Sequence, residues 1–572
     1  MTASAMPPAL DLLLAHADDG APALAGGLAD DAVHRTAPPA RLPDAHQLRN
    51  RGRDPNDLVE QRWALIVPEG ETGARLVAAV APLVERRRAQ QGGHPVQVYR
   101  VPPRMDAGEA ARWHREVYLD ERVAEADLPF YQLILGDLDQ VPLALQQVQT
   151  IDGVVGRLAF DAPADYEAYV AKLLGWEDRP APIPRARALF HAVHDGTSAT
   201  ASGYQALISP ALAAARADRE LGRYDAADVV ELGDPGRAPS RDDLLAAAAA
   251  ADPSVLLGVG HGQGAPRRGW RSPDDQRRLQ GALSFGADGA LAGADLAGRR
   301  CLPGGVWFLL ACYSAGTPDA SAYRPWLERL RDLGQYGERV DAVLRSLPAA
   351  GERPFIAALP RAALASPDGP IGFVGHIDLA WSYSFQELDA SGPKNRLRRF
   401  LSLLGYVLRR DRIGVAFREL VSCALAADTE LLTLYARQAI GPALDPADQA
   451  RLGHLWMLRQ DLLGYVLLGD PAARLPIAPP AVSATPTPIN PADLFSFALG
   501  APATPPPAPS PPTPAADADP LERAILALLA GGRDLRAIAA EHRVEPGELE
   551  RLAKIYGDAG RAALAAHRRG LS

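Results

Sequence analysis

Short apolar runs alternate with stretches of helical periodicity along most of the chain. A first series of apolar runs lies at 63–68, 96–101, 131–136 and 155–160, with helical patterns between them. A second series lies at 188–193, 229–232, 254–259, 305–310, 355–359 and 371–375, and a helical stretch from 395 to about 461 follows. Continuous apolar strands that alternate with helices are typical of a parallel, doubly wound α/β sheet. We therefore expect two consecutive α/β/α units.

Changes in composition divide the chain into five segments. Residues 1–58 are rich in Ala, Pro, Asp and Arg without periodicity, so we expect a flexible leader. The first α/β unit, at 59–178, lacks a pair of reactive side chains, and a proline-rich hinge near 180–184 leads into the second unit at 179–476. Residues 477–519 are proline-rich and predict a semi-rigid linker. Helical periodicity returns at 520–572 and predicts a small helical domain.

Two apolar runs of the second unit end in reactive side chains beside small residues. The run that starts at Ser254 ends in His261-Gly262, and the run that starts at Gly305 ends in Ala311-Cys312. In open α/β sheets the chemistry gathers beyond the carboxyl ends of the strands. If the two strands are neighbours, His261 and Cys312 emerge side by side, and an imidazole next to a thiol is the arrangement that activates a cysteine nucleophile.

This pair predicts acyl transfer at a carbonyl carbon. Cys312 would attack the carbonyl, and His261 would protonate the leaving amine. The backbone N–H groups of Gly262 and Cys312 are the expected oxyanion donors, because the small residue after His261 lets the main chain approach the substrate. The sequence identifies no third residue that would orient the imidazole.

The motifs around the pair resemble the caspase-like (clan CD) cysteine peptidases, and more closely their gingipain-like and CHAT-type bacterial members. The resemblance covers about residues 60–476 and is carried, besides the two strand ends, by Gln280-Gly-Ala-Leu, Ala311–Pro318, Phe373–Trp381 and Leu467–Pro471. It implies a caspase-like fold, a non-catalytic subdomain before the catalytic one, and a Cys–His dyad that works without a carboxylate.

The resemblance also implies an acidic residue that binds a basic P1 side chain. Asp195, in the loop after the first strand of the second unit, is the candidate, although Asp-Gly is also a common turn. Asp378 is the rival, Trp381 would wall the pocket, and His376 is interpreted as part of the pocket framework. We expect cleavage after Arg or Lys, by a regulated bacterial effector.

Composition and cysteine spacing indicate the cellular compartment and argue against some classes of ligand. The formal net charge of −9 gives no basic field that would favour nucleic acid. The three cysteines have neither disulfide nor metal spacing, which suits a reducing cytoplasm, and we expect no metal and no cofactor. Neither a signal peptide nor a membrane-spanning run is visible, so the predicted location is cytoplasmic.

The C-terminal segment leaves a second class of function open. Residues 534–551 resemble a transposase-type helix-turn-helix, but Glu548 and Glu550 at the start of the second helix would repel phosphate. A protein partner is therefore the favoured interpretation of 520–572, beside a protein substrate for the α/β part. The alternatives are a DNA-binding regulator and a non-catalytic scaffold on a peptidase fold.

Overall fold

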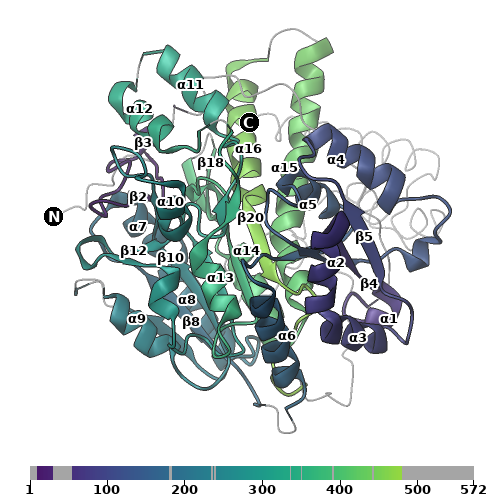
Figure 1. Ribbon diagram of the computed structural model, residues 1–572. Helices are drawn as coiled ribbons and strands as arrows, with labels where there is room; N and C mark the ends of the chain where they lie inside the picture. The colour runs from purple at the N-terminus through teal and green to yellow at the C-terminus, as the bar shows by residue number, and fades with distance from the viewer. Residues whose placement is uncertain are drawn as a thin grey trace, which may run out of the picture. The chain divides into compact units, whose positions relative to one another are not determined.

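A mixed ten-stranded sheet forms the centre of the computed structural model (Figure 1). The structure describes residues 9–29, 32, 54–179, 183–233, 236–237, 240–334, 336–349, 351–389, 392–440 and 444–479. The strands of the sheet, in spatial order, are β5 (Gln97–Val101), β4 (Trp63–Pro68), β6 (Tyr131–Leu135), β7 (Val154–Leu158), β20 (Tyr465–Gly469), β17 (Gly372–His376), β14 (Val306–Leu310), β10 (Ser254–Val259), β8 (Arg187–Ala192) and β9 (Val229–Leu232).

The sheet consists of two parallel halves that run in opposite directions. All neighbours are parallel except β17 and β20, which pair antiparallel between Gly372↔Gly469 and His376↔Tyr465. Each half begins with the same strand order, with its first strand between its second and its third. The sheet is therefore continuous across the two predicted α/β units, and the carboxyl ends of β8, β10 and β14 lie at one edge of it.

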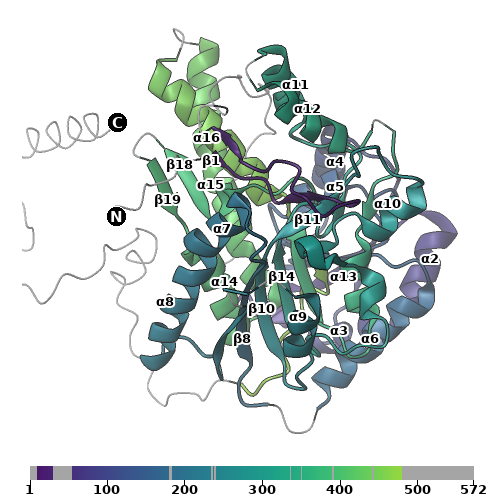
Figure 2. The same cartoon turned by 90° about the vertical axis from the view of Figure 1, so that its left-hand side faces the viewer.

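Helices cover both sides of the sheet, as expected for apolar strands that must be buried on two faces. Figure 2 shows α8 and α14 on one side and α6, α9 and α13 on the other. The helices are α1 (Leu58–Gln61), α2 (Gly70–Ala79), α3 (Ala81–Gln90), α4 (Ala107–Trp113), α5 (Leu143–Gln149), α6 (Pro163–Glu177), α7 (Ser198–Gly203), α8 (Ser209–Glu220), α9 (Arg241–Ala248), α10 (Pro273–Leu279), α11 (Arg324–Asp332), α12 (Gly337–Ser346), α13 (Ala358–Ala365), α14 (Arg398–Leu408), α15 (Ile413–Ile440) and α16 (Pro446–Leu463).

A second, four-stranded sheet sits where β10 ends. Its order is β13 (Ala290–Leu291), β12 (Leu283–Ser284), β11 (His261–Gly264) and β2 (Leu14–His16). Three two-stranded ribbons complete the strands: β1 (Ala9–Leu10) with β3 (Leu28–Ala29), β15 (Gly316–Thr317) with β16 (Phe355–Ile356), and β18 (Gln386–Asp389) with β19 (Gly392–Asn395).

Part of the predicted flexible leader is packed into the fold. Residues 12–15, Leu-Leu-Leu-Ala, are completely buried, and β2 adds to the edge of β11 with Leu14 opposite Gly262. Four consecutive apolar residues are enough to bury a short strand once a free sheet edge is present. Composition gave no sign of this, because the run is short and the polar residues around it dominate the window.

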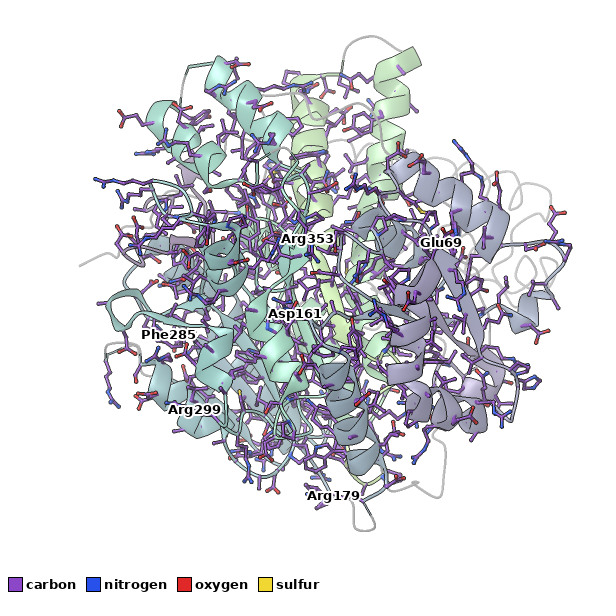
Figure 3. The ribbon with its side chains drawn as sticks, in the orientation of Figure 1. Glu69, Asp161, Arg179, Phe285, Arg299 and Arg353 are labelled. Carbon is purple, nitrogen blue, oxygen red and sulfur yellow. The ribbon has the colours of Figure 1, made fainter. Side chains whose placement is uncertain are left out.

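Hydrogen bonds and ion pairs connect the two predicted α/β units. The Asp470 carboxylate, directly after β20, accepts hydrogen bonds from Arg87 Nε at 2.8 Å and from Trp63 Nε1 at 3.0 Å, and both donors belong to the first predicted unit. Arg353 and Asp161, labelled in Figure 3, mark further contacts, with Asp139 and Arg361 respectively. The Gly-Asp-Pro turn of 469–471 is thus structural.

The predicted linker beyond residue 479 and the predicted helical domain at 520–572 lie outside the described residues. Within the part of the chain that the structure describes, no helix is long and apolar enough to cross a membrane.

Candidate active site

Parallel pairing brings the two reactive strand ends together at one edge of the sheet. β10 and β14 are neighbours with Val259 opposite Leu310, so His261 and Cys312 each follow two residues later. The backbones stay in contact beyond the strands: a Cβ atom at Gly262 would lie 1.8 Å from the carbonyl oxygen of Cys312. Only glycine permits this approach, which makes Gly262 a geometric requirement of the site.

His261 is completely buried and is held through one ring nitrogen. Its Nε2 lies 2.9 Å from Thr197 Oγ1, and its Nδ1 has no hydrogen-bond partner among the described residues. Thr197 Oγ1 in turn donates to Asp195 Oδ1 at 2.8 Å. Because that hydroxyl proton is directed to the carboxylate, the hydroxyl accepts from His261. The imidazole proton then sits on Nε2, and the Nδ1 lone pair is free to act as a base.

Asp195 faces His261. Its Oδ2 lies 3.8 Å from His261 Nε2, while its Oδ1 accepts from the Thr197 N–H, the Thr197 hydroxyl and the Thr200 hydroxyl. The sequence predicted Asp195 in a P1 pocket and no orienting group. The geometry gives the imidazole an orienting chain of Thr197 and Asp195, and its only signal in the sequence was the Asp195-Gly-Thr197 turn directly after β8.

Cys312 is also completely buried, and its thiol is hydrogen-bonded to the main chain of Ala380. The Ala380 N–H donates to Sγ at 3.1 Å, and Sγ lies 3.6 Å from the Ala380 carbonyl oxygen. Tyr313 adopts a left-handed φ of 57°, which turns the chain sharply directly after Cys312. Burial raises the pKa of the Cys312 thiol well above its usual value, and burial lowers the pKa of His261 to about 4 against the opposing pull of Asp195. Both groups are therefore neutral in this covered state.

Two backbone N–H groups of the site converge on one oxygen atom. Gly262 N–H and Cys312 N–H donate to the carbonyl oxygen of Leu13 at 2.8 and 3.0 Å. These are the two donors that the sequence predicted for an oxyanion. The carbonyl that they bind comes from the N-terminal segment, which runs alongside both residues.

Asp378 and Trp381 lie in one buried loop beside Cys312, and His376 is the last residue of β17, directly before that loop. The Asp378 carboxylate accepts from the N–H groups of Leu379 and Ala322, each at 2.8 Å, and burial raises its pKa to about 6. Trp381 is completely buried, and Leu12 pairs with it in an antiparallel bridge. His376 Nε2 lies 3.0 Å from the Asp461 carbonyl oxygen, so its imidazole is part of the framework of this loop.

Asp461 organises this loop and gave no signal in the sequence. Its carboxylate accepts from the N–H groups of Trp381 and Ser384, both at 2.7 Å. It comes from α16, about eighty residues further along the chain, inside a helix whose pattern otherwise indicates only packing.

No family model matches the sequence, and no curated protein matches it either. Solved structures give three likenesses. The crystal structure of the Arg-specific cysteine proteinase gingipain R is 12% identical with a TM-score of 0.38, covering 73% of this chain and 78% of that one. A structure described as a protease is 11% identical with a TM-score of 0.42, covering 73% and 80%. The complex of the pro- and mature domains of RgpB from Porphyromonas gingivalis is 12% identical with a TM-score of 0.35, covering 72% and 79%. At these values the likeness concerns the fold alone, and the chemistry has to be judged from the residues of the site.

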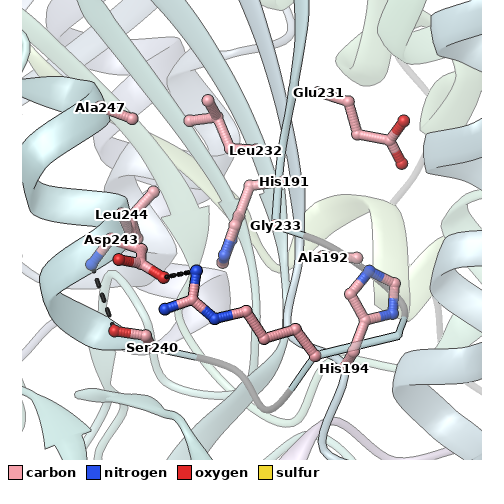
Figure 4. Close-up of a pocket in the computed structure, with 11 residues that line it drawn as sticks. His191, Ala192, His194, Glu231, Leu232, Gly233, Ser240, Asp243, Leu244 and Ala247 are labelled. Carbon is pink, nitrogen blue, oxygen red and sulfur yellow. Dashed lines mark hydrogen bonds and ion pairs between the residues drawn. The ribbon is translucent and has the colours of Figure 1, made fainter.

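A separate pocket of about 220 Å³ lies between β8, β9 and α9 (Figure 4). His191 and His194 line it, and Arg237 crosses it to reach Asp243 at 3.2 Å. Neither His261 nor Cys312 lines this pocket. Among the described residues, no group of three or more His, Cys, Asp or Glu side chains is arranged to hold a metal ion.

Proposed function

We propose that the chain is a cysteine peptidase in which Cys312 is the nucleophile and His261 the general base and acid. The observation that carries the proposal is the convergence of Gly262 N–H and Cys312 N–H on one carbonyl oxygen, 2.8 and 3.0 Å away. A pair of preorganised N–H donors next to a thiol and an imidazole is what stabilises the oxyanion of acyl transfer. The two N–H groups therefore support a carbonyl carbon as the point of attack.

Each residue of the site has a separate role in the proposed reaction. His261 Nδ1 takes the thiol proton, because Thr197 keeps the other ring proton on Nε2. Cys312 Sγ adds to the carbonyl carbon, and the oxygen develops negative charge between the two N–H groups. Asp195 favours the imidazolium that forms, since its Oδ2 lies 3.8 Å from the ring. Thr197 and Asp195 are positioning residues.

The basic P1 preference stays a prediction. It needs a carboxylate that is free to meet an arginine, and both candidates accept several hydrogen bonds from this chain: Asp195 from Thr197 and Thr200, and Asp378 from Leu379 and Ala322. A role as a regulated bacterial effector is likewise a proposal. The DNA-binding alternative depends on residues 520–572, outside the described part.

The test is hydrolysis of a proteome-derived peptide library, with cleavage sites read by mass spectrometry. We expect cleavage by the wild-type chain and a loss of about three orders of magnitude or more in Cys312→Ala and His261→Gln. Cys301→Ala and Cys423→Ala are the matched controls and should retain activity, since neither residue lies in the site. Unchanged cleavage by Cys312→Ala would overturn the proposal. If the wild type cleaves nothing, a second variant decides: Leu12→Asp puts a charge at a buried position and should release the N-terminal segment. Failure of iodoacetamide to label Cys312 in that variant, together with the lack of cleavage, would also overturn the proposal.

A further inference from the structure

The N-terminal segment crosses the dyad in an extended conformation and is held there by main-chain bonds. Leu13 N–H donates to the Ala380 carbonyl oxygen at 3.3 Å, and the Leu13 carbonyl accepts from Gly262 and Cys312. Before Leu13 the segment pairs antiparallel with Trp381, and after it the segment runs parallel to β11. The segment is thus hydrogen-bonded to the rest of the chain on both sides of one peptide bond, the bond between Leu13 and Leu14.

These contacts have the form of a bound substrate. The carbonyl that two oxyanion donors hold is the one that a nucleophile attacks, so Leu13 occupies the P1 position and Leu14 the P1′ position. An inert strand would need only its own ladder of hydrogen bonds. Here the oxygen also takes the N–H of the proposed nucleophile itself.

Side chains of the segment indicate what the cleft selects. Leu13 is only 1% exposed, so its side chain is removed from water at the P1 position. Burying a leucine is favourable, whereas an unpaired charge in the same place would be strongly unfavourable. Two residues earlier, the Asp11 carboxylate accepts from the hydroxyls of Ser198 at 2.9 Å and Ser202 at 2.7 Å.

We propose that this segment is a substrate of its own chain and that the Leu13–Leu14 bond is a processing site. The chemical class of substrate is a peptide bond that follows a large apolar residue, with a carboxylate two residues before it. The proposal rests on the proposed function, because it uses the same thiol and imidazole.

The reaction consumes one water molecule and changes no oxidation state. Cys312 Sγ bonds to the Leu13 carbonyl carbon as its proton moves to His261, the Leu13 C–Leu14 N bond breaks, and His261 gives the proton to the new Leu14 amine. The remaining thioester is hydrolysed: water gives one proton to His261 and its hydroxide to the Leu13 carbonyl carbon, the Sγ–carbon bond breaks, and His261 returns its proton to the sulfur. Leu13 leaves as a carboxylic acid, which ionises and releases its proton to solvent. Release of the fragment that ends at Leu13 uncovers the dyad.

The experiment follows the intact mass of the purified full chain at neutral pH under reducing conditions. We expect the wild type to be converted to a species that begins at Leu14, and Cys312→Ala to remain whole. Leu13→Met keeps an apolar P1 residue and should be processed within several-fold of the wild-type rate. Leu13→Asp should be processed at least about 100-fold more slowly, because it places a charge in the apolar position.

The outcomes separate this proposal from the proposed function. A wild-type chain that stays whole while it hydrolyses the peptide library overturns the processing site and leaves the peptidase standing. A chain that is cut at Leu13–Leu14 equally fast in Cys312→Ala shows contaminating proteolysis and also overturns it. Processing of Leu13→Asp at the rate of Leu13→Met would overturn the apolar substrate class. If wild type neither processes itself nor cleaves the library, and the thiol of the Leu12→Asp chain is not alkylated, both proposals fail together.

Discussion

The hydroxyl of Thr197 lies 2.9 Å from His261 Nε2 and directs its own proton to Asp195, 2.8 Å away. This relay determines which nitrogen of the imidazole carries the proton. It also connects the loop after β8, which carries Thr197 and Asp195, to His261 at the start of β11. Because β8 and β10 are neighbours in the sheet, these residues lie close enough for Thr197 to fix the protonation state of the imidazole. A neutral imidazole with a free Nδ1 is the form that can accept the thiol proton.

Replacing Thr197 should therefore impair the reaction without removing a group that touches the substrate. In Thr197→Val the Nε2–H loses its acceptor and the tautomer is no longer fixed, so we expect kcat/KM to fall about 10- to 100-fold with KM nearly unchanged. Thr197→Ser keeps the hydroxyl and should restore most of the activity. Steady-state kinetics on a peptide identified from the library provides the measurement. Equal losses in the Ser and Val variants would mean that Thr197 acts only through packing.

Gly262 should tolerate no side chain. A Cβ atom there would lie 1.8 Å from the Cys312 carbonyl oxygen, so Gly262→Ala must push β11 away from the nucleophile. We expect a loss of about 3 kcal/mol in the free energy of unfolding and, in the molecules that still fold, a peptidase rate at least about 100-fold lower. Denaturant melts and single-turnover rates measure the two effects separately.

Gly175, within α6, is the matched control for this substitution. A Cβ atom at Gly175 would meet nothing within 4 Å, so Gly175→Ala should raise stability by about 0.5–1 kcal/mol and leave the rate unchanged. A Gly262→Ala chain as stable and as active as Gly175→Ala would contradict the close approach on which the oxyanion site depends.

Much of this arrangement was accessible from the pattern of residues, and the reasons are local. Apolar runs that end in His261 and Cys312 fix strand ends, and parallel strands place such ends at one edge; the structure brings the two residues together there. The α/β class was predicted for the same reason, whereas the antiparallel pairing of β17 with β20 was not. That the two predicted units share one sheet was not predicted, because the pairing of β7 with β20 joins residues about 300 positions apart.

The parts that the sequence did not predict depend on contacts between distant segments. Asp195 is followed by a common turn dipeptide, and nothing in that turn reveals that its carboxylate faces His261 across 3.8 Å. The three leucines at 12–14 are too few to indicate a strand until the free edge of β11 is known. Asp461 acts on backbone groups of a loop some eighty residues away, and a helix pattern carries no trace of such a role.

The pKa of His261 should report whether the N-terminal segment is in place. Burial holds this pKa at about 4, below the ordinary 6.5, because the charged imidazolium is deprived of water. We expect Leu12→Asp, which puts a charge at a completely buried position, to release the segment and move the His261 pKa up towards 6.5. Histidine-labelled NMR titrations measure it, with His261→Gln to assign the signal.

His191 is the internal control for that titration. Burial also lowers its pKa to about 4, but it lines the separate pocket and should not change in Leu12→Asp. Global stability is a poor substitute as a readout. A lowered histidine pKa removes stability as the pH falls from about 6.5 to about 4, whereas Asp378, with its pKa raised to about 6, adds stability as the pH falls towards 3.8. An unchanged His261 pKa in Leu12→Asp would mean that the segment does not control hydration of the dyad.

Asp195→Ala distinguishes the two roles that this residue has been given. If its carboxylate binds a basic P1 side chain, the substitution lowers kcat/KM for Arg peptides by roughly two orders of magnitude and hardly affects Leu peptides. If it supports His261 through Thr197, every P1 residue suffers by the same factor, because the base serves all substrates. The contacts of Oδ1 with Thr197 and Thr200 favour the second result.

Two fluorogenic peptides that differ only in Arg or Leu at P1 are sufficient to distinguish the two roles of Asp195. We expect the ratio of their kcat/KM values to be the same in wild type and Asp195→Ala. A ratio that changes about 100-fold would return Asp195 to the P1 pocket, and a change seen only in Asp378→Ala would assign that pocket to Asp378.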